Sequence, residues 1–314
     1  MSDHPKIGLV LGGGGSRGLA HIGVLKILIR EQIPIDFIVG TSMGAIVGVL
    51  YALEYNPAEI AQGISLLLEG STVINMKMLS ARSRQRRVRA SFQESLGDKT
   101  FADLSIPVTV MTVDMRHGCE VAISEGPLVP ALLASSAVPG AFPPVKHDGL
   151  ELADGGVIDS LATHVAYEQG ADKIIAVDVY PEIDRENPWI DPISAVMGIK
   201  LPANIFSANN NGGQKTPSAA ASMWRSVRVM TWYLHQERLA AHPPDVLLRP
   251  NVDDYGSLDF RDVDGPIQAG VEEAERQVEA LRALAAPKPV IKTRLSPLNL
   301  IKDRIWKYHN EQSR

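Results

Sequence analysis

The sequence predicts an α/β fold in which helices cover a mainly parallel sheet. Strand-like runs at residues 7–11, 35–39, 107–113 and 173–179 alternate with helix-like segments along the chain. Several of these runs are apolar at both alternating positions, which is the pattern of strands buried on both faces. An alternation of such strands with helices indicates a parallel sheet between helical layers.

The first predicted strand, residues 7–11, runs into a glycine-rich loop. The loop reads Gly12-Gly13-Gly14-Gly15-Ser16-Arg17-Gly18, and an apolar segment with helical character follows from Leu19 to Ile29. A glycine loop between a strand and a helix presents free backbone N–H groups beside the positive end of the helix dipole. This loop is therefore predicted to form a site for negative charge.

The second predicted strand, residues 35–39, ends at a serine framed by glycines. The pentapeptide Gly40-Thr41-Ser42-Met43-Gly44 precedes a helix-like run from Ala45 to Leu53. A tight strand-to-helix turn with small flanking residues leaves a serine hydroxyl exposed, so Ser42 is predicted to be a nucleophile. Residues 37–53 carry no charge, but the run breaks into strand, turn and helix, and we expect a buried helix and not a membrane span.

Two later helices have recognisable beginnings. Asn56-Pro57-Ala58-Glu59 combines a capping residue, a proline at the first helical position and a glutamate at the third. Gly265-Pro266 opens a second helix, whose other face is acidic. Its apolar residues, spaced four and three apart, are Ile267, Val271, Ala274, Val278 and Leu281.

Composition restricts the class of protein. The 314 residues are 45% hydrophobic, which is ample for a sizeable core, and their formal charge is -5. Nucleic-acid binding needs a clear basic excess, so we expect no nucleic-acid partner. Cys119 is the single cysteine, which excludes a disulfide framework and a cysteine-rich metal site and fits a reducing compartment. Residues 1–6 show no secretory signal, so a cytoplasmic protein is expected.

Two stretches depart from the alternating pattern. Five arginines crowd into eight residues of this acidic chain, and they are Arg82, Arg84, Arg86, Arg87 and Arg89. They form either a solvated helix face or loop, or a contact with anionic lipid headgroups on the inner face of a membrane. Residues 180–240 combine Pro, Asn and Gly clusters with scattered aromatic side chains, which is typical either of a lid or binding loop or of packed core.

The predicted nucleophile needs a base. A histidine oriented by a carboxylate is the usual partner, but His21 lies in the apolar helix, where a packed, hydrogen-bonded role is favoured. Asp154 follows a short apolar strand and precedes Gly155-Gly156, so its carboxylate either belongs to a plain Asp-Gly turn or aims into a cleft. His147 and His164 flank this segment and are the alternative bases.

These motifs together resemble the ordered signature of the patatin-like phospholipase family, in its bacterial branch. The likeness covers roughly residues 5–180 and returns faintly around 258–273; it rests on the glycine loop, Gly40–Gly44, residues 134–145 and Asp154-Gly155-Gly156. It implies a three-layer α/β/α patatin-like fold with a mainly parallel central sheet. The family domain is expected at residues 5–286, with a variable lid-like or loop segment at about 180–240, followed by a C-terminal extension at 287–314.

The resemblance also implies a site and a reaction. Ser42 would be the nucleophile and Asp154 its base, in a dyad without histidine. The implied supporting residues are the oxyanion-hole glycines Gly13, Gly14 and Gly15, then Arg17 and Gly18 in the loop, Gly40 and Gly44 at the elbow, and Gly155 and Gly156 after the base. Arg17 would hold the loop or meet anionic groups of the substrate. The substrate would be a lipid or fatty-acyl ester, cleaved as by a phospholipase A, a lysophospholipase or a carboxylesterase, with no cofactor and no metal.

One segment departs from the family pattern. Ile158-Asp159-Ser160-Leu161-Ala162 replaces the Asn-x-Pro-like residues that often follow the Asp-Gly-Gly motif, which alters the local shape of the cleft and hence substrate choice. The chemistry makes a further demand, since an aspartate with a pKa of about 4 is a poor base at neutral pH. Burial beside an acyl channel is therefore expected to raise the pKa of Asp154.

Three other functions remain open at the level of sequence. The first is a Ser-His-Asp α/β-hydrolase, in which a histidine would replace Asp154 as the base. The second is a phosphate- or nucleotide-binding module, because Gly13, Gly15 and Gly18 satisfy G-x-G-x-x-G, although no acidic residue closes the second strand and no Gly-Lys-Ser/Thr follows. The third is a non-catalytic scaffold, against which the intact motifs count.

Overall fold

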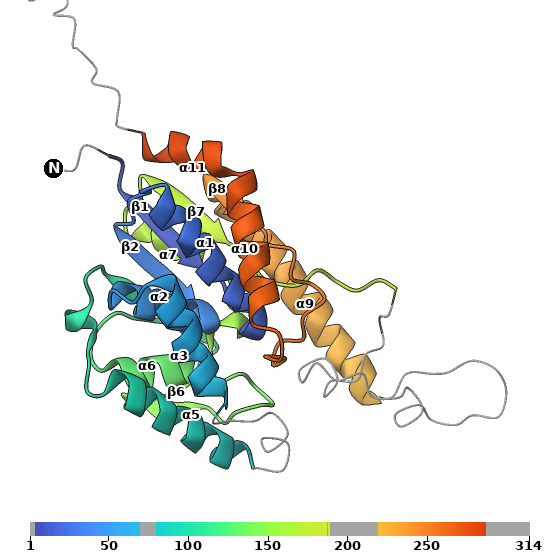
Figure 1. Ribbon diagram of the computed structural model, residues 1–314. Helices are drawn as coiled ribbons and strands as arrows, with labels where there is room; N and C mark the ends of the chain where they lie inside the picture. The colour runs from blue at the N-terminus through green and yellow to red at the C-terminus, as the bar shows by residue number, and fades with distance from the viewer. Residues whose placement is uncertain (1–3, 70–79, 187, 189–218, 287–314) are drawn as a thin grey trace, which may run out of the picture.

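Four apolar strands with helical crossovers form the centre of the structure, a computed structural model that describes residues 4–69, 80–186, 188 and 219–286 (Figure 1). They are β1 (Ile7–Leu11), β2 (Phe37–Thr41), β3 (Val108–Asp114) and β7 (Lys173–Val177). β2 and β3 pair in parallel, and so do β1 and β2, and β1 and β7. Every residue of β1, β2 and β3 is buried, which confirms the prediction of strands covered on both faces.

Shorter strands complete the sheet: β4 lies on one edge of β3, and β6 follows β2 along the other edge. The order is β5-β6-β3-β2-β1-β7-β8, and β4 also pairs with β3. β8 joins β7 in parallel, whereas β6 and β4 run antiparallel to β3. Their bounds are Cys119–Ile123 for β4, Val145–His147 for β5, Leu150–Asp154 for β6 and Val246–Leu248 for β8. The sheet is therefore mixed but mainly parallel.

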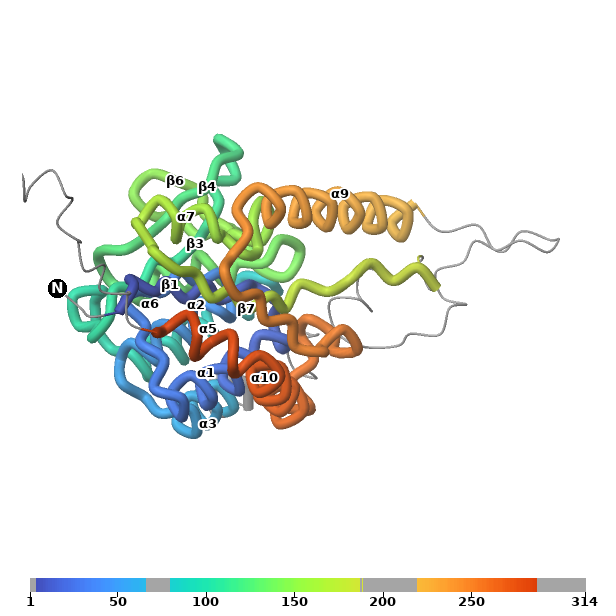
Figure 2. Tube along the Cα trace, turned by 90° about the horizontal axis from the view of Figure 1, so that it is seen from above, coloured from blue at the N-terminus to red at the C-terminus, as the bar shows by residue number. Residues whose placement is uncertain are grey.

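Helices cover both faces of this sheet, which confirms the three-layer arrangement (Figures 1 and 2). Leu9, Leu11 and Ile38 point to the face covered by α1, α2 and α10, whereas Val10 and Val39 point to the face covered by α7 and the end of α9. The bounds are Ala20–Arg30 for α1, Met43–Ala52 for α2, Pro57–Glu69 for α3, Thr163–Glu168 for α7, Ala219–Ala241 for α9 and Asp264–Arg276 for α10. Alternate strand residues thus serve two separate cores.

The remaining helices are shorter or lie at the edges of the molecule. They are α5 (Ala81–Leu96), α6 (Leu128–Ser135) and α11 (Val278–Ala285), with 3-10 turns η1 (Gly15–Leu19), η2 (Phe101–Asp103) and η3 (Gly155–Val157). None of the described helices is both long enough and apolar enough to cross a membrane. The uncharged run of residues 37–53 folds as predicted into β2, a turn and the buried helix α2.

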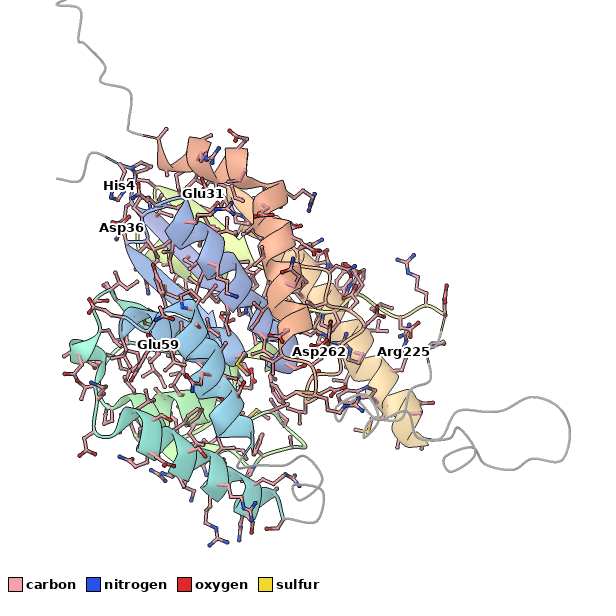
Figure 3. All side chains as sticks on the ribbon, in the orientation of Figure 1. His4, Glu31, Asp36, Glu59, Arg225 and Asp262 are labelled. Carbon is pink, nitrogen blue, oxygen red and sulfur yellow. The ribbon has the colours of Figure 1, made fainter. Side chains whose placement is uncertain are left out.

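The two predicted helix starts have different outcomes. The Asn56 side chain accepts hydrogen bonds of 3.0 Å from the N–H groups of Ala58 and Glu59, and the Glu59 carboxylate accepts one of 2.8 Å from the Asn56 N–H (Figure 3). This confirms the cap of α3. The single helix expected after Gly265 is wrong, because Gln277 leaves helical geometry and its side-chain amide donates to the Leu247 carbonyl of β8. Two helices, α10 and α11, result.

The variable segment contains a long helix that the sequence analysis did not expect. Within residues 180–240, the part from Ala219 onward is α9, and residues 187 and 189–218 lie outside the described residues. The expected extension at 287–314 also lies outside them. The apolar residues of α9 are distributed over several sides of the helix. Its sequence therefore shows no single apolar stripe of the kind that identifies a surface helix.

Candidate active site

The register of three strands brings Ser42 and Asp154 together. Ser42 follows β2, Asp154 ends β6, and both strands pair with the same edge of β3, because β4 occupies its other edge. Thr41 is paired with Met111, and Asp154 is paired with Thr112, the next residue of β3. The C-terminal ends of β2 and β6 therefore meet at neighbouring residues of β3. The Ser42 hydroxyl hydrogen-bonds to the Asp154 carboxylate, and both side chains are buried.

The turn at Ser42 is a strained elbow held by its neighbours. Ser42 has φ 53° and ψ -120°, a conformation that side chains other than glycine rarely adopt. A Cβ at Gly44 would lie 2.1 Å from the Leu11 carbonyl oxygen, so the helix can approach β1 only through glycine. The Ser42 N–H donates to Ser135 Oγ (2.8 Å), which in turn donates to the Met111 carbonyl (2.7 Å). These contacts fasten the elbow to β3.

Burial makes the Asp154 carboxylate a stronger base. It raises the pKa of this carboxyl from 3.8 to about 6, while hydrogen bonds from the Ser42 hydroxyl and the Gly156 N–H act in the opposite direction. The Gly156 N–H donates to Oδ1 at 2.8 Å, which fixes the orientation of the carboxylate. A carboxylate with this pKa is ionised at neutral pH and accepts a proton more readily than an ordinary aspartate.

The glycine loop lies directly beside the nucleophile. A Cβ at Gly13 would stand 3.3 Å from the Cβ of Ser42. Ser160 holds Gly13 from both sides, because its carbonyl accepts from the Gly13 N–H (2.9 Å) and its hydroxyl donates to the Gly13 carbonyl (2.8 Å). The expectation that Gly13 offers a free donor is therefore wrong in this conformation. Within the described residues, the N–H groups of Gly14 and Gly15 donate to no partner.

Arg17 is buried behind this loop and binds a distant segment. Its Nη1 donates to Ser257 Oγ at 3.0 Å, and the N–H of Ser16 donates to the Ser257 carbonyl at 2.9 Å. Burial lowers the pKa of Arg17 to about 10, so the guanidinium remains charged at neutral pH. Gly18 lets η1 approach α2, since a Cβ there would lie 2.6 Å from Cγ of Met43. Among the described residues, Arg17 forms no ion pair.

The histidines of the described residues bond away from the nucleophile. His21 Nε2 lies 2.7 Å from the Gly12 carbonyl, and burial lowers the pKa of His21 to about 4, so the neutral ring donates this bond. His147 lies beside Asp148 at 3.5 Å, and His164 beside two other carboxylates. In the part of the chain that the structure describes, Ser42 has a hydrogen bond to Asp154 and none to a histidine.

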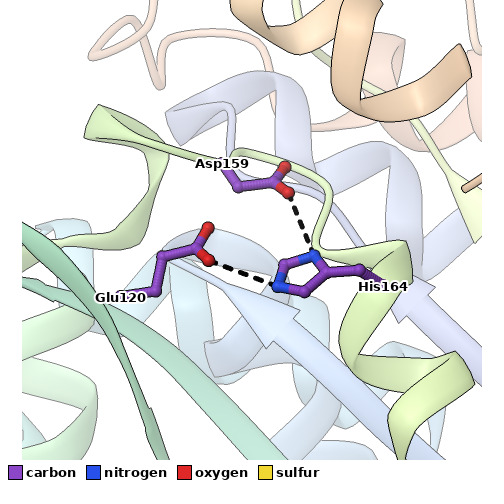
Figure 4. A group of neighbouring side chains, drawn as sticks. All are labelled: Glu120, Asp159 and His164. Atoms are coloured by element: carbon purple, nitrogen blue, oxygen red, sulfur yellow. Dashed lines mark ion pairs between the residues drawn. The ribbon is translucent and has the colours of Figure 1, made fainter. Parts of the chain in front are cut away.

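Glu120, Asp159 and His164 form a compact group that resembles a metal site (Figure 4). His164 lies 3.3 Å from each carboxylate, and these hydrogen bonds raise its pKa to about 9. Arg238 of α9 adds a second cation, with Nη1 at 2.8 Å from Glu120 and 3.2 Å from Asp159. A protonated imidazole cannot ligate a metal, and two cations already balance the two carboxylates. This group is an ion network that joins α9 to the segment after Asp154.

Sequence reasoning missed the residues that support the loop and the base. Ser160 and Asp159 lie within the segment that departs from the family pattern, yet their partners Gly13 and Arg238 are far away in the chain. No local spacing connects them. The departure itself was the available signal, because it marked residues 158–162 as specific to this chain.

The chain is similar in sequence to several known proteins. The model of the family described as patatin-like phospholipase matches residues 9–167. Lysophospholipase nte1 of Aspergillus fumigatus is 30% identical over 286 residues, which cover 88% of this chain and 18% of that protein. Lysophospholipase NTE1 of Yarrowia lipolytica is 31% identical over 264 residues, with 81% and 18% covered. The chain thus spans less than a fifth of the length of these relatives.

Solved structures and a second type of relative complete the comparison. Neuropathy target esterase sws of Drosophila melanogaster is 34% identical over 188 residues, or 57% of this chain and 13% of that protein. VipD from Legionella pneumophila superposes with a TM-score of 0.47 at 12% identity, covering 90% of this chain and 67% of VipD. The family model spans half of the chain and includes the glycine loop, Ser42 and Asp154, and this chain belongs to the patatin-like phospholipase family.

Proposed function

We propose that this protein is a serine hydrolase that cleaves fatty-acyl esters of lipids with Ser42 and Asp154 as a catalytic dyad. The observation that carries the proposal is the hydrogen bond from the Ser42 hydroxyl to a buried carboxylate whose pKa is raised to about 6. The strained elbow and the adjacent glycine loop support it, because acyl transfer needs an accessible nucleophile beside oxyanion donors.

The reaction follows from these positions. Asp154 takes the hydroxyl proton as Ser42 Oγ attacks the ester carbonyl carbon, and the carbonyl oxygen becomes an oxyanion. The N–H groups of Gly14 and Gly15 donate to this oxyanion. The tetrahedral intermediate then collapses: the alcohol leaves with the proton from Asp154, and an acyl-enzyme remains. In the second half, Asp154 takes a proton from water as the water oxygen attacks the acyl carbon. The tetrahedral intermediate then releases the fatty acid, and Asp154 returns the proton to Ser42 Oγ, which regenerates the hydroxyl and the carboxylate.

The substrate class is proposed from the relatives and from charge. The curated relatives carry the name lysophospholipase, so lysophospholipids are the first substrates to test. Arg17 lies in the loop that holds the proposed oxyanion donors, and its positive charge favours an acidic headgroup nearby. Phospholipids with two acyl chains and simple carboxylic esters are the other members of the panel.

We also propose that α5 contacts an anionic membrane surface, on the inner face of a membrane. Arg82, Arg86, Arg87 and Arg89 are exposed on this helix. Arg84 differs, because its Nη2 donates to the Ala141 carbonyl at 2.6 Å, so it supports the chain after α6. The contact therefore involves four of the five arginines named from the sequence. Each arginine near an anionic surface contributes about 1 kcal/mol.

The function is tested with a fluorophosphonate probe and a panel of lysophospholipids, phospholipids and p-nitrophenyl esters. Ser42→Ala should abolish labelling, and both Ser42→Ala and Asp154→Asn should abolish hydrolysis in protein that remains folded. Ser105→Ala and Asp148→Asn are matched controls, since both residues are exposed. Full activity of Asp154→Asn would contradict the dyad, and tight nucleotide binding without labelling would favour a binding module.

A further inference from the structure

The outward face of α9 is apolar over most of its length. Met223 is 73% exposed, and Met230 and Tyr233 are each 61% exposed. The apolar residues of this outer face are Met223, Val227, Val229, Met230, Tyr233 and Leu234, and we call them the α9 face. Residues 223, 227, 230 and 234 are spaced four, three and four apart, which places them on one stripe of a helix. Exposed apolar stripes of this extent indicate an interaction surface.

The opposite side of α9 is fastened to the body of the protein. His235 is buried, and its Nε2 lies 3.1 Å from the Asp178 carboxylate. Tyr180 OH donates to Thr231 Oγ1 (2.7 Å), and Arg228 Nη1 donates to Tyr180 OH (2.9 Å). The ion network with Arg238 holds the C-terminal end. These bonds fix which side of the helix faces outward, so the exposure of the α9 face follows from its docking.

The docked side of α9 is linked to the glycine loop through the chain that leaves β7. The chain that leaves β7 accepts from the glycine loop, with the Gly12 N–H donating to the Val177 carbonyl, and three residues later Tyr180 bonds to α9. In Figures 1 and 2, the N-terminal half of α9 projects past the sheet on the side where the chain leaves β7. Membrane contact through this part of α9 would therefore also bring the end of β7, and the glycine loop bonded to it, toward the membrane.

The charged residues of α9 indicate which class of partner the α9 face would bind. Residues 219–236 contain two arginines and no aspartate or glutamate. Arg225 lies on the N-terminal half of α9 (Figure 3), where its Nη1 donates to the Asp184 carbonyl, and its position borders the α9 face. The stripe meets a carboxylate only at its C-terminal end, where the exposed Glu237 follows Leu234 by three residues. An apolar face bordered by arginine, with its carboxylate confined to one end, is a composition of helices that lie in the interface of an anionic bilayer.

We propose that the α9 face inserts into the headgroup region of an anionic lipid bilayer and so places the active site at the membrane surface. The biological reason for this docking rests on the proposed function, because a lipid hydrolase reaches its substrate by binding to a bilayer. Its binding step is independent of hydrolysis. The helix lies parallel to the membrane plane, with its apolar side chains among the acyl chains and Arg225 among the phosphates.

The test uses full-length protein carrying Ser42→Ala, so that vesicles stay intact, and vesicles with equal parts of phosphatidylcholine and phosphatidylglycerol. Co-flotation measures binding. The double variant Met223→Glu, Met230→Glu should reduce the partition coefficient about tenfold or more, because two carboxylates replace apolar side chains at an anionic surface. Met115→Glu is the matched control, since Met115 is exposed in the turn after β3, and it should bind like the parent. Thermal unfolding verifies that all variants fold.

Three other outcomes would overturn the proposal, and a fourth bears on the proposed function alone. Unchanged flotation of the double variant would show that the α9 face does not bind lipid. A dimer that the double variant converts to a monomer, measured by light scattering, would identify a second copy as the partner. A third measurement labels Met223→Cys with an environment-sensitive dye in a Cys119→Ser background. A dye already in an apolar environment without vesicles, and unaltered by them, would show that the chain itself covers the face. If the wild-type protein has no esterase activity although the Ser42→Ala protein floats with vesicles, the proposed function alone is refuted.

Discussion

Replacing Asp154 with asparagine should abolish hydrolysis and, above about pH 6, make the folded protein more stable. Burial raises the pKa of this carboxyl from 3.8 to about 6, so the folded state favours the protonated form. The stability that protonation provides is complete below the unfolded pKa of 3.8 and is lost as the pH rises through about 6. Asparagine does not titrate, so it avoids this loss while keeping an oxygen that accepts from the Gly156 N–H.

The size of the effect follows from the two pKa values. Their difference corresponds to about 3 kcal/mol of unfolding free energy across the full titration. Between about pH 5 and about pH 8, roughly 1.4 kcal/mol of this is lost by the wild type. The unfolding free energy of Asp154→Asn minus that of the wild type should therefore increase by this amount over the same interval. The acidic limb of the rate against pH should fall near the same pKa of about 6.

Urea unfolding followed by circular dichroism measures the stability difference at each pH. Hydrolysis of a water-soluble p-nitrophenyl ester, measured from acid to neutral pH, gives the rate profile of the wild type. Asp148→Asn is the control, because the exposed Asp148 side chain should give a stability difference that barely changes with pH. A stability difference for Asp154→Asn that stays constant from acid to neutral pH would refute the argument that burial raises its pKa.

Three further variants test other parts of the site. The unfolding free energy of Ser42→Gly, measured with urea, should exceed that of Ser42→Ala by about 1 to 2 kcal/mol, because glycine adopts φ 53° without strain. Equal stability of the two variants would contradict a strained elbow. Ser160→Ala should reduce kcat by about ten- to hundredfold with a small change in KM, because the Gly13 carbonyl loses its hydroxyl donor and the adjacent N–H donors move; an unchanged kcat would remove the Ser160 hydroxyl from the support of the loop. His164→Gln should lower the melting temperature below about pH 6.5, and the difference should vanish as the pH passes about 9, because the protonated ring of His164 has the raised pKa; a deficit that persists at higher pH would indicate a packing role.

The strands and the elbow could be predicted from the sequence because their signals are local. The run that became β1 is apolar throughout, and Ser42 lies between glycines after the strand-like run of residues 35–39. The predicted bounds differ from the observed ones by two residues at most at the start of each central strand, for example Phe37 in place of residue 35. Patterns of this kind describe one element at a time.

The arrangement of the site depends on contacts between distant segments. Nothing near Gly13 indicates that its N–H donates to Ser160, and nothing near Asp159 indicates Arg238 as its partner. α9 escaped prediction for a related reason, since its apolar residues serve two purposes. Some, such as Ala221, pack against the body, whereas others, such as Met223, face outward, and together they hide the helical period.

The pairing of both strands of the dyad with one edge of β3 has a consequence for folding. Ser42 belongs to the parallel part of the sheet, whereas Asp154 arrives on a strand that pairs antiparallel with the same edge of β3, beyond the end of β2. Pairings between segments so distant in the chain form slowly, because a long loop must close before its contacts stabilise it. Hydrolytic activity can therefore return only after β6 has joined the sheet. In a refolding experiment, the recovery of hydrolytic activity would report when β6 pairs with β3, separately from the earlier collapse of the parallel core.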